Sequence, residues 1–428
     1  MVSRLVLVRH AKTQARDPEI IDKDRQLTRA GRCSIEARFP VSLQLLAEEN
    51  VDEVKIWSSP ALRAMQTAEV VARSLGIGGI EIRESLYADS VDTFMGELAE
   101  ESGTLIVVGH NPFMEELYGR LSGTAQDMGT GAMASFGFTA AGEHLAGVGS
   151  WLEWFVQGPR VELWQSIADV EDGLAGAAKR IARRAATLLE NPDDPEALHQ
   201  YRISLRIARS LLGFVAPYCK GAPVRKTMRD IKRLQDPTSR VRELDMLHEA
   251  LDSQAAEAAI VGEARTQLRA GFLERFAGDA TQKELARVVK RIANVPWRRS
   301  IRQSGLDGQV LVDRVAQMRA DYELSMAHVD YDDQEAVHDV RKEAKALRYV
   351  TREFSRLLPE SAGTTNVRAK AVQDKLGELC DCWNNAQLVI EICGPQAVQI
   401  ASRFVVRADE IVVDLRRGRT YGLAISDS

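Results

Sequence analysis

The chain lacks the features of a membrane-spanning, disulfide-stabilised or secreted protein. Its 428 residues contain no apolar run of about 18 residues, so we expect no membrane-spanning helix. Five irregularly spaced cysteines argue against a disulfide framework or a zinc site. The apolar stretch near the first residue is too short for a secretory signal, and we expect a cytoplasmic protein. Hydrophobic residues make up 45% of the chain, enough to form a globular core.

Charge is distributed unevenly along the chain. Residues 1–159 contain 14 Lys and Arg against 22 Asp and Glu, a net charge of −8. Residues 160–428 contain 42 against 39, a net charge of +3. At about 150 residues per domain, the length predicts two or three domains. The charge difference indicates that the two halves have different electrostatic character.

The first 155 or so residues alternate between short apolar runs and helical spacing. Three short runs, apolar except for Lys55, are typical of buried parallel strands. They are Leu5–Val8, Val54–Trp57 and Leu105–Val108. Residues 59–75 have helical spacing, with Pro60 near the start, where proline is tolerated. The alternation predicts an α/β domain over residues 1–158, a three-layer sandwich with a mostly parallel sheet.

After about residue 160, apolar residues recur every three or four positions and no strand pattern is evident. We expect about eight helices, over residues 165–190, 196–218, 223–251, 253–277, 281–293, 308–328, 334–357 and 366–390. Two stretches, which begin at His199 and His338, each have a cation 3, 7 and 10 residues after the histidine. This echo predicts an all-α domain over residues 165–422, built from two repeated four-helix units.

Histidines and arginines follow the predicted strands of the first region. Arg9 and His10 follow the first strand, and His110 follows the third. Arg63 falls in the first turn of the helix after the second strand. Ligands of an open α/β sheet bind at the carboxyl ends of its strands. A histidine nucleophile beside arginines suits phosphoryl transfer, because guanidinium groups match phosphate oxygens and positioning supplies most of the catalysis.

The residues after His110 also favour an anion site. Asn111 has the character of a helix N-cap, and Pro112 that of the first helical residue. A helix that begins here would leave free backbone N–H groups near His110. Such groups favour the binding of an anion.

Three motifs of this region resemble those of the histidine phosphatase superfamily. They are Leu7–Ala11, Ser58–Ala68 and Val108–Pro112, and Asp24–Gly31 resembles the small phosphohistidine phosphatase branch. The resemblance covers roughly residues 1–155 and implies that His10 is the nucleophile that becomes phosphorylated. It implies that the phosphoryl group is bound by Arg9, Arg63 and His110, with Arg25 as a further contact.

The resemblance leaves the leaving-group acid and the substrate open. Glu84 is the candidate acid, with an ordinary surface glutamate as the alternative. The small branch tends to lack such an acid, because phosphohistidine leaves without strong acid help. Phosphohistidine on a protein, a small phosphate ester and polyphosphate itself are all candidate substrates. No metal or other cofactor is implied.

Two cationic stripes lie on predicted helices of the second region. At about 100° per residue, offsets of 0, 3, 7 and 10 residues fall within an arc of about 80°. The stripes are His199, Arg202, Arg206 and Arg209, then His338, Arg341, Lys345 and Arg348, continued by Arg352 and Arg356. Few acidic residues lie between them, and crowded cations repel one another unless an anion joins them. A solvated helix face is the alternative interpretation.

Roughly residues 165–420 resemble the CHAD family, the conserved histidine α-helical domain. Both His-led stretches and Gln373–Gly377 carry the resemblance. It implies a two-fold repeated helical bundle whose basic channel binds inorganic polyphosphate. The stripe residues then become polyphosphate ligands, with weaker additions from Arg229, Lys232, Arg233 and Lys370. Ile207 stands where the family commonly has an arginine, so we expect a weaker first half-site.

These observations predict a metal-independent phosphatase whose helical domain binds polyphosphate, without a role for a membrane. The alternative is a non-catalytic polyphosphate-binding or targeting protein with a vestigial phosphatase fold. The intact set of motif residues argues against that alternative, because a degenerate site is expected to lose one of them. Nucleic acid is the least favoured polyanion, because the second region has a net charge of only +3 and no aromatic-rich platform.

Overall fold

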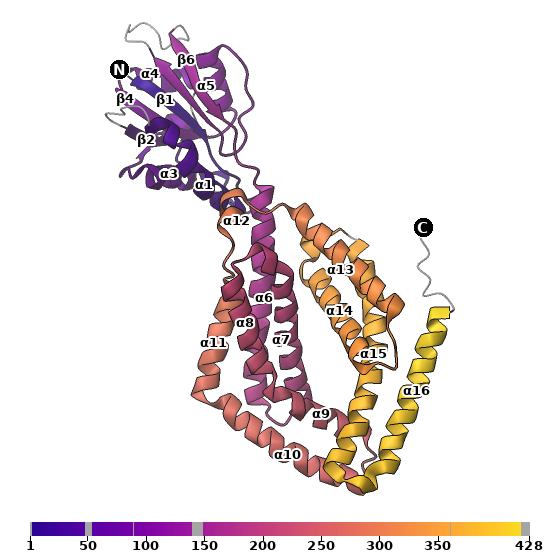
Figure 1. Ribbon diagram of the computed structural model, residues 1–428. Coiled ribbons are helices and arrows are strands. Elements are labelled where there is room, and N and C mark those ends of the chain that lie inside the picture. Colours follow the sequence, from indigo (N-terminus) through magenta and orange to yellow (C-terminus); the bar gives the residue numbers. More distant parts are fainter. Residues whose placement is uncertain (1, 48–53, 89, 139–148, 360, 421–428) are drawn as a thin grey trace. The chain divides into compact units, whose positions relative to one another are not determined.

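The computed structural model describes residues 2–47, 54–88, 90–138, 149–359 and 361–420 (Figure 1). The chain divides into two compact units. The sheet unit consists of Met1–Ala168 and Arg299–Asp307, and the helical unit of Asp169–Arg298 and Gly308–Ser428. Among the helices in the described ranges, none combines the length and the apolarity that a membrane span requires.

The sheet unit contains a six-stranded mixed sheet in the order β3-β2-β4-β1-β5-β6. The strands are β1 (Val2–Arg9), β2 (Val54–Ser58), β3 (Glu81–Ile82), β4 (Gly103–Gly109), β5 (Met133–Phe138) and β6 (Ser150–Val156). The first four run parallel to one another, whereas β5 and β6 join the sheet by antiparallel pairing. The three predicted apolar runs form β1, β2 and β4, three of the four parallel strands.

Helices cover both faces of the parallel strands. On one face, Val6, Val8 and Ile106 pack with residues of α1 (Arg29–Ser42) and α3 (Leu62–Leu75). On the other face, Leu5, Leu7 and Trp57 pack with residues of α4 (Val91–Ala99) and α5 (Phe113–Ser122). Successive strand side chains point to opposite faces, so burial of both faces requires continuous apolar runs. This burial fixes the strand ends at which the predicted site residues lie.

A short segment from the middle of the helical region belongs to the sheet unit. It includes α12 (Arg299–Ser304) and is followed by Leu306, which is buried. The backbone N–H of Leu306 donates to the carbonyl of Leu163 at 2.9 Å. The helical pattern of the sequence did not predict this segment.

The helical unit is all-α, and its helices match most of the predicted segments. They are α6 (Glu162–Glu190, which begins in the sheet unit), α7 (Pro195–Val215), α8 (Gly221–Gln235), α9 (Pro237–Ala250), α10 (Ala256–Ala277), α11 (Asp279–Ala293), α13 (Gly308–His328), α14 (Gln334–Glu353), α15 (Ser361–Cys393) and α16 (Val398–Thr420). The expectation of eight helices was too low. The predicted segment 223–251 is two helices, because Pro237 begins a new one, and α16 was not predicted. The two-fold repeat stays a prediction.

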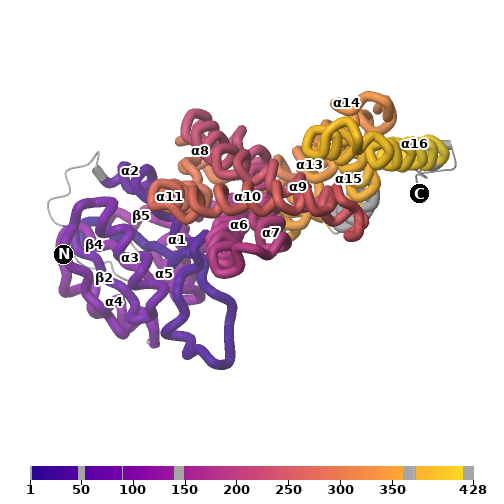
Figure 2. Tube along the Cα trace, turned by 90° about the horizontal axis from the view of Figure 1, so that it is seen from below, coloured from indigo at the N-terminus to yellow at the C-terminus, as the bar shows by residue number. Residues whose placement is uncertain are grey.

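The helices that carry the two stripes begin in the same way. Asp194 caps α7, where its side chain accepts from the backbone N–H of Glu196 at 2.9 Å. Asp333 caps α14 and accepts from the N–H of Glu335 at 2.9 Å. Each cap therefore precedes the stripe histidine by five residues. Within the helical unit, α14 packs against both α13 and α15, and α15 packs against α16 (Figure 2).

Candidate functional site

A cavity of about 560 Å³ lies where β1 and β4 end and α3 begins. Its lining consists of Arg9, His10, Lys12, Thr13, Arg16, Asp22, Arg25, Arg63, Tyr87, His110, Asn111 and Thr130. Five residues predicted from the sequence thus meet in one cavity: Arg9, His10, Arg25, Arg63 and His110.

The ring of His10 is buried and held in one orientation. Its Nδ1–H donates to the carbonyl of Ala11 at 2.8 Å, and this tautomer leaves the lone pair on Nε2. Burial lowers the pKa of His10 to about 4, and the charges of Arg63 and Arg9 add to this effect. The imidazole is therefore neutral at neutral pH, as a nucleophile must be.

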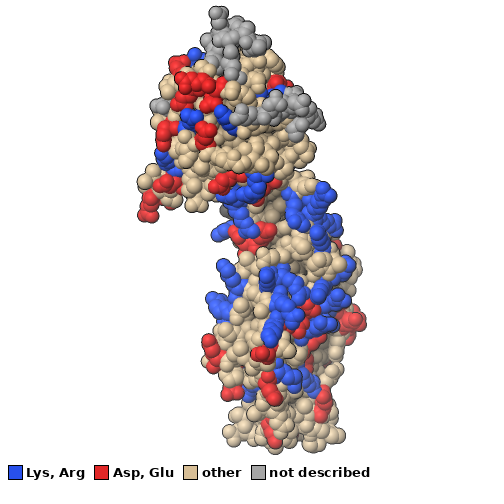
Figure 3. Space-filling view, turned by 90° about the vertical axis from the view of Figure 1, so that its left-hand side faces the viewer, with Lys and Arg blue, Asp and Glu red and all other residues tan. Residues whose placement is uncertain are grey.

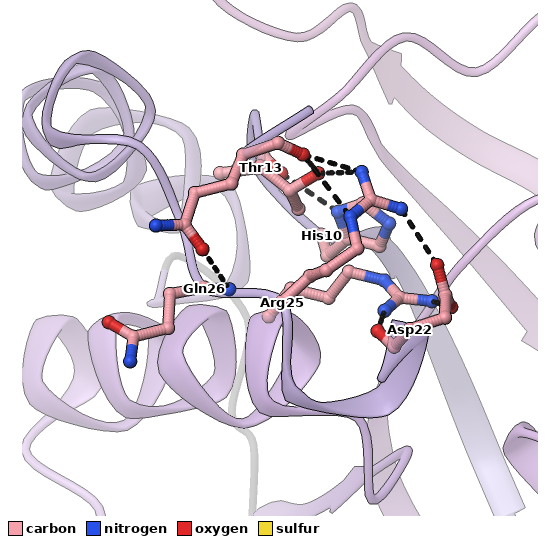
Figure 4. Close-up of polar contacts among 8 residues, drawn as sticks. His10, Thr13, Asp22, Arg25 and Gln26 are labelled. Atoms are coloured by element: carbon pink, nitrogen blue, oxygen red, sulfur yellow. Dashed lines mark hydrogen bonds and ion pairs between the residues drawn. The ribbon is translucent and has the colours of Figure 1, made fainter. Parts of the chain in front are cut away.

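Asp22 joins two of the cavity arginines, as Figure 4 shows. One carboxylate oxygen, Oδ1, accepts from Arg25 Nη1 at 2.8 Å, and Oδ2 accepts from Arg63 Nη2 at 2.9 Å. The hydrogen bond from Arg25 and the charge of Arg63 lower the pKa of Asp22. Sequence reasoning missed Asp22. The available signal was an acidic residue three positions before Arg25, in the segment that follows β1.

His110 lies at the cavity, but the helix after it begins later than predicted. Pro112 is the N-cap of α5 and Phe113 its first residue, so the prediction that Asn111 is the cap was wrong by one position. The Asn111 side chain instead donates from Nδ2 to the carbonyl of Met128 at 3.3 Å, and the Asn111–Pro112 peptide is cis. Burial and the charge of Arg63 lower the pKa of His110.

A close approach of the backbone shapes the segment that carries Asp22 and Arg25. A Cβ at Gly31 would lie 2.3 Å from the carbonyl oxygen of Lys12, so only glycine allows α1 to lie this close. Thr28 caps α1 by accepting from the N–H of Gly31 at 3.0 Å. These contacts close the loop between β1 and α1, drawn in indigo in Figure 2.

Glu84 lies outside this arrangement. It begins a short 3-10 helix, Glu84–Leu86, and its exposed carboxylate lies 3.4 Å from Nζ of Lys23. Glu84 is absent from the residues that line the cavity. No group of three or more His, Cys, Asp or Glu side chains in the described part of the chain is arranged to hold a metal ion.

The helical unit contains a second set of converging cations, here called the basic cluster: Arg206 of α7, Arg242 of α9, and Arg341, Lys345 and Arg348 of α14. Lys345 is only 9% exposed. No hydrogen bond or ion pair within 4 Å joins the side chain of Lys345 or Arg206 to another described residue, although the charge of Asp381 acts on both. Burial, followed by the charges of Arg341 and Arg206, lowers the pKa of Lys345 to about 6. The stripe is therefore more than a solvated helix face at this point.

One carboxylate, Asp381 of α15, lies among these cations. Its Oδ1 is 3.9 Å from Nη1 of Arg341, and burial raises its pKa. Gly377 of α15 leaves room for the Arg341 guanidinium, because a Cβ there would lie 3.0 Å from Nη2. Sequence reasoning found Arg341 and the motif around Gly377, but it missed the roles of Arg242 and Asp381.

The remaining residues of the first stripe are dispersed. Arg202 donates to the hydroxyls of Thr238 and Ser239, the latter at 3.2 Å, and burial lowers its pKa to about 10. Burial and the charge of Arg242 lower the pKa of His199. Arg209 is exposed. Ile207 is buried in the core, so a cation at this position would be costly.

The second stripe ends earlier than predicted. The helix α14 ends at Glu353, so Arg356 lies in a following 3-10 helix, Ser355–Leu357, and not on the stripe. From His338, which is exposed, to Arg352 the stripe spans about 21 Å. Arg352 pairs with its neighbour Glu353 at 2.7 Å.

The weaker candidates lie on exposed surfaces. They are Arg229, Lys232 and Arg233 of α8 and Lys370 of α15. Arg233 pairs with Asp230 at 3.4 Å. Lys and Arg side chains gather on the helical unit on the face drawn in Figure 3. No hydrogen bond or ion pair among the described residues joins these four side chains to the basic cluster.

Two family models match the chain. The CHAD domain model matches residues 172–389, just over half of the chain. The model of the histidine phosphatase superfamily (branch 1) matches residues 5–101. No curated protein matched the chain.

Solved structures similar to each part of the chain are known. A SixA protein from Agrobacterium tumefaciens is 25% identical over 36% of this chain and 98% of its own, with a TM-score of 0.30. A protein histidine phosphatase SixA complexed with tungstate is 23% identical over 36% of this chain and 96% of its own, with a TM-score of 0.30. The CHAD domain from the plant Ricinus communis is 18% identical over 58% of this chain and 86% of its own, with a TM-score of 0.48. By its family matches, the chain belongs to the CHAD domain family, and the region ahead of the CHAD match is similar to the histidine phosphatase superfamily (branch 1) over residues 5–101.

Proposed function

We propose that this protein is a metal-independent phosphatase that forms a phosphohistidine intermediate on His10, and that its helical domain binds inorganic polyphosphate. The hydrogen bond from His10 Nδ1–H to the Ala11 carbonyl carries the first part. It fixes the tautomer in which Nε2 has the lone pair, inside a cavity lined by five cationic side chains. A neutral nucleophile surrounded by fixed positive charge suits attack on a phosphoryl group.

The proposed reaction has two displacements. In the first, Nε2 of His10 forms a bond to phosphorus while the bond from phosphorus to the leaving oxygen or nitrogen breaks, and the leaving group takes up a proton from solvent water. In the second, water attacks phosphorus, the bond between phosphorus and Nε2 breaks, and the attacking water loses a proton to solvent, which leaves orthophosphate and neutral His10. The cations of the cavity, Arg9 and Arg63 among them, stabilise the charge on the phosphoryl oxygens in both steps. The substrate class we favour is phosphohistidine on a protein or a small phosphate ester.

Trapping the intermediate tests this proposal. The full chain, mixed briefly with a ³²P-labelled substrate and denatured, should carry a label that acid removes and alkali does not, as expected for phosphohistidine. Mapping should place the label on His10. A chain that hydrolyses substrate without labelling His10 contradicts the proposed intermediate.

The buried amine of Lys345 supports the second part of the proposal. The protonated form of a buried amine is costly unless a counter-charge joins it. No hydrogen bond or ion pair within 4 Å joins the Lys345 amine to a described residue, and Asp381 acts on it only from farther away. Arg206 and Arg341 lie close enough to lower its pKa further. A polyanion that reaches all three would supply the missing charge, and successive phosphates of one chain can do so at once.

Titration with polyphosphate of defined length tests the second part. We expect binding that weakens as salt is raised, because contacts to a polyanion release condensed counterions, as with nucleic acid. Single-stranded DNA of similar charge is the matched competitor. Binding of DNA as tight as that of polyphosphate would contradict the assignment of the ligand.

A further inference from the structure

Asp22 is an anion already present among the cations of the cavity. It is the one carboxylate among the described residues that line it, beside Arg9, Lys12, Arg16, Arg25 and Arg63. Its two carboxylate oxygens accept from Arg25 and Arg63 at 2.8 and 2.9 Å (Figure 4). Its backbone carbonyl also accepts from Arg63 Nη1, at 2.5 Å. Both terminal nitrogens of Arg63 are therefore engaged by Asp22.

A phosphoryl group and Asp22 would compete for the same donors. Phosphate oxygens bind arginine through the N–H groups that here point at Asp22. Two like charges within about 4–6 Å also disfavour each other. Because Arg25 and Arg63 lower the pKa of Asp22, its carboxylate stays charged at neutral pH. Phosphate must then displace this carboxylate or bind beside it against repulsion.

The position of Asp22 allows such a displacement. It begins the three-residue 3-10 helix Asp22–Asp24, in the loop between β1 and α1. Its side chain is 45% exposed, whereas that of Arg63 is only 7% exposed. The carboxylate can therefore turn toward solvent while the guanidinium stays in place.

We propose that Asp22 is an internal competitor anion that weakens the binding of orthophosphate and so promotes release of this product. The inference rests on the proposed phosphatase function. A cavity lined by five cations would otherwise hold a small dianion tightly, and product release limits the turnover of many enzymes. As phosphate leaves, the carboxylate of Asp22 returns to Arg63 and Arg25.

The competing view makes Asp22 a positioning residue that holds Arg63 ready for phosphate. The two views predict opposite signs. Loss of a positioning carboxylate weakens phosphate binding, whereas loss of a competitor strengthens it. The measurement is the inhibition constant of orthophosphate against a chromogenic aryl phosphate, with the full chain.

Asp22→Asn removes the charge and keeps the size of the side chain, and Asp22→Ala removes both the charge and the acceptors. Asp24→Asn is the matched control, because Asp24 is exposed, lies two residues away and does not line the cavity. We expect the inhibition constant to fall about tenfold in both Asp22 variants and to stay within about twofold of wild type in the control. An unchanged or raised constant in Asp22→Asn overturns the proposal.

Direct binding separates this inference from the proposed function. If the wild-type chain hydrolyses no substrate, the phosphatase proposal fails, but orthophosphate binding can still be titrated by calorimetry. Orthophosphate binding that is lost in Arg63→Ala is assigned to the cavity. If the dissociation constant of this cavity binding is lower in Asp22→Asn than in wild type, the competitor role is supported. An equal or higher dissociation constant overturns it.

Discussion

The cavity of the sheet unit and the basic cluster of the helical unit treat positive charge differently. In the cavity, Asp22 lies 2.8 and 2.9 Å from the guanidinium groups of Arg25 and Arg63. In the basic cluster, Lys345 has no such partner, and the nearest carboxylate to Arg341 is 3.9 Å away. Similar side chains can therefore form a site in which a carboxylate pairs directly with the cations, or one in which several cations share a single carboxylate, Asp381, at a longer distance.

The difference matches the ligands proposed for the two sites. A small phosphoryl group must bind and leave in every turnover, so an internal anion in its place is useful. A long polyanion has many charges and can neutralise several neighbouring cations together.

The largest effect is expected for His10→Ala. Loss of the nucleophile should lower phosphatase activity about 10⁴-fold or more and abolish covalent labelling. Polyphosphate binding should be unchanged, since His10 belongs to the other unit. Parallel activity and binding assays on the full chain check this. Substantial activity in the variant removes His10 from the mechanism.

Next comes the replacement of Arg341, Lys345 and Arg348 together by Ala. We expect polyphosphate affinity to fall about 100-fold or more. The slope of the logarithm of affinity against the logarithm of salt concentration should also decrease, by an amount that corresponds to about two to three fewer phosphate contacts. Phosphatase activity should remain. The matched control replaces the exposed residues Arg229, Lys232 and Arg233 by Ala. This control removes the same net charge as the cluster triple.

The control triple should weaken binding far less than the cluster triple. Replacing Arg202, Arg206 and Arg209 should have an intermediate effect, since Arg206 belongs to the basic cluster and Arg209 is exposed. If the control and the cluster triples lose the same affinity, binding follows net charge, and the buried cluster has no special role.

Lys345→Met should separate stability from binding. We expect the variant to bind polyphosphate more weakly and to be more stable, with a free energy of unfolding about 1–2 kcal/mol above that of wild type at pH 7. The reason is that burial lowers the pKa of Lys345 to about 6, against about 10.4 in the unfolded chain.

Between these pKa values the unfolded chain binds the extra proton, so wild-type stability rises with pH. The gain from Lys345→Met should therefore shrink as the pH approaches 10. Chemical denaturation at pH 7 and pH 10 measures it. A variant that is less stable at pH 7 would show that the amine is compensated in the free protein.

The pH dependence of catalysis should show only a small effect between pH 5.5 and 7.5. With a pKa of about 4, His10 stays neutral over this range. An ordinary imidazole would lose about 90% of its neutral form by pH 5.5. We therefore expect kcat/KM, corrected for titration of the substrate's phosphate, to change by less than about twofold. A fall in kcat/KM as the pH drops through about 6.5 would show that the pKa of His10 is that of an ordinary imidazole.

Chelation should have the smallest effect. EDTA added to the full chain is expected to leave phosphatase activity unchanged, because His10, His110 and the one carboxylate, Asp22, lie among cationic side chains and form no metal-ligating group in the described part of the chain. Inhibition that a divalent ion reverses would contradict the metal-independent reaction.

The sequence predicted those elements and site residues whose signal lies within a short stretch of neighbouring residues. The strands β1, β2 and β4 are buried on both faces, and this produces the continuous apolar runs that predicted them. The later strands were missed because their pairing depends on distant residues. Glu153 of β6, for example, pairs with Arg4 of β1 at 2.7 Å and accepts from Ser135 of β5 at 2.6 Å. Neither contact has a local signature.

The same limit applies to the sites. Motifs identified His10 and the stripes because their residues are close in sequence. Asp22 was missed because an acidic residue in a loop is ordinarily solvated. Arg242 and Asp381 were missed because they reach the basic cluster from other helices. The helix α16 was missed because valines such as Val398, Val406 and Val413 are exposed and blur its periodicity.

The segment Arg299–Asp307 affects the order in which the chain becomes complete during synthesis. The sheet unit includes this segment, so it lacks one of its parts until residue 307 has left the ribosome. Domains usually fold one after another from the first residue synthesised. Here the sheet unit is one segment short while about half of the helical unit is made. A nascent chain stopped after residue 168 should therefore be more sensitive to protease than one stopped well beyond residue 307.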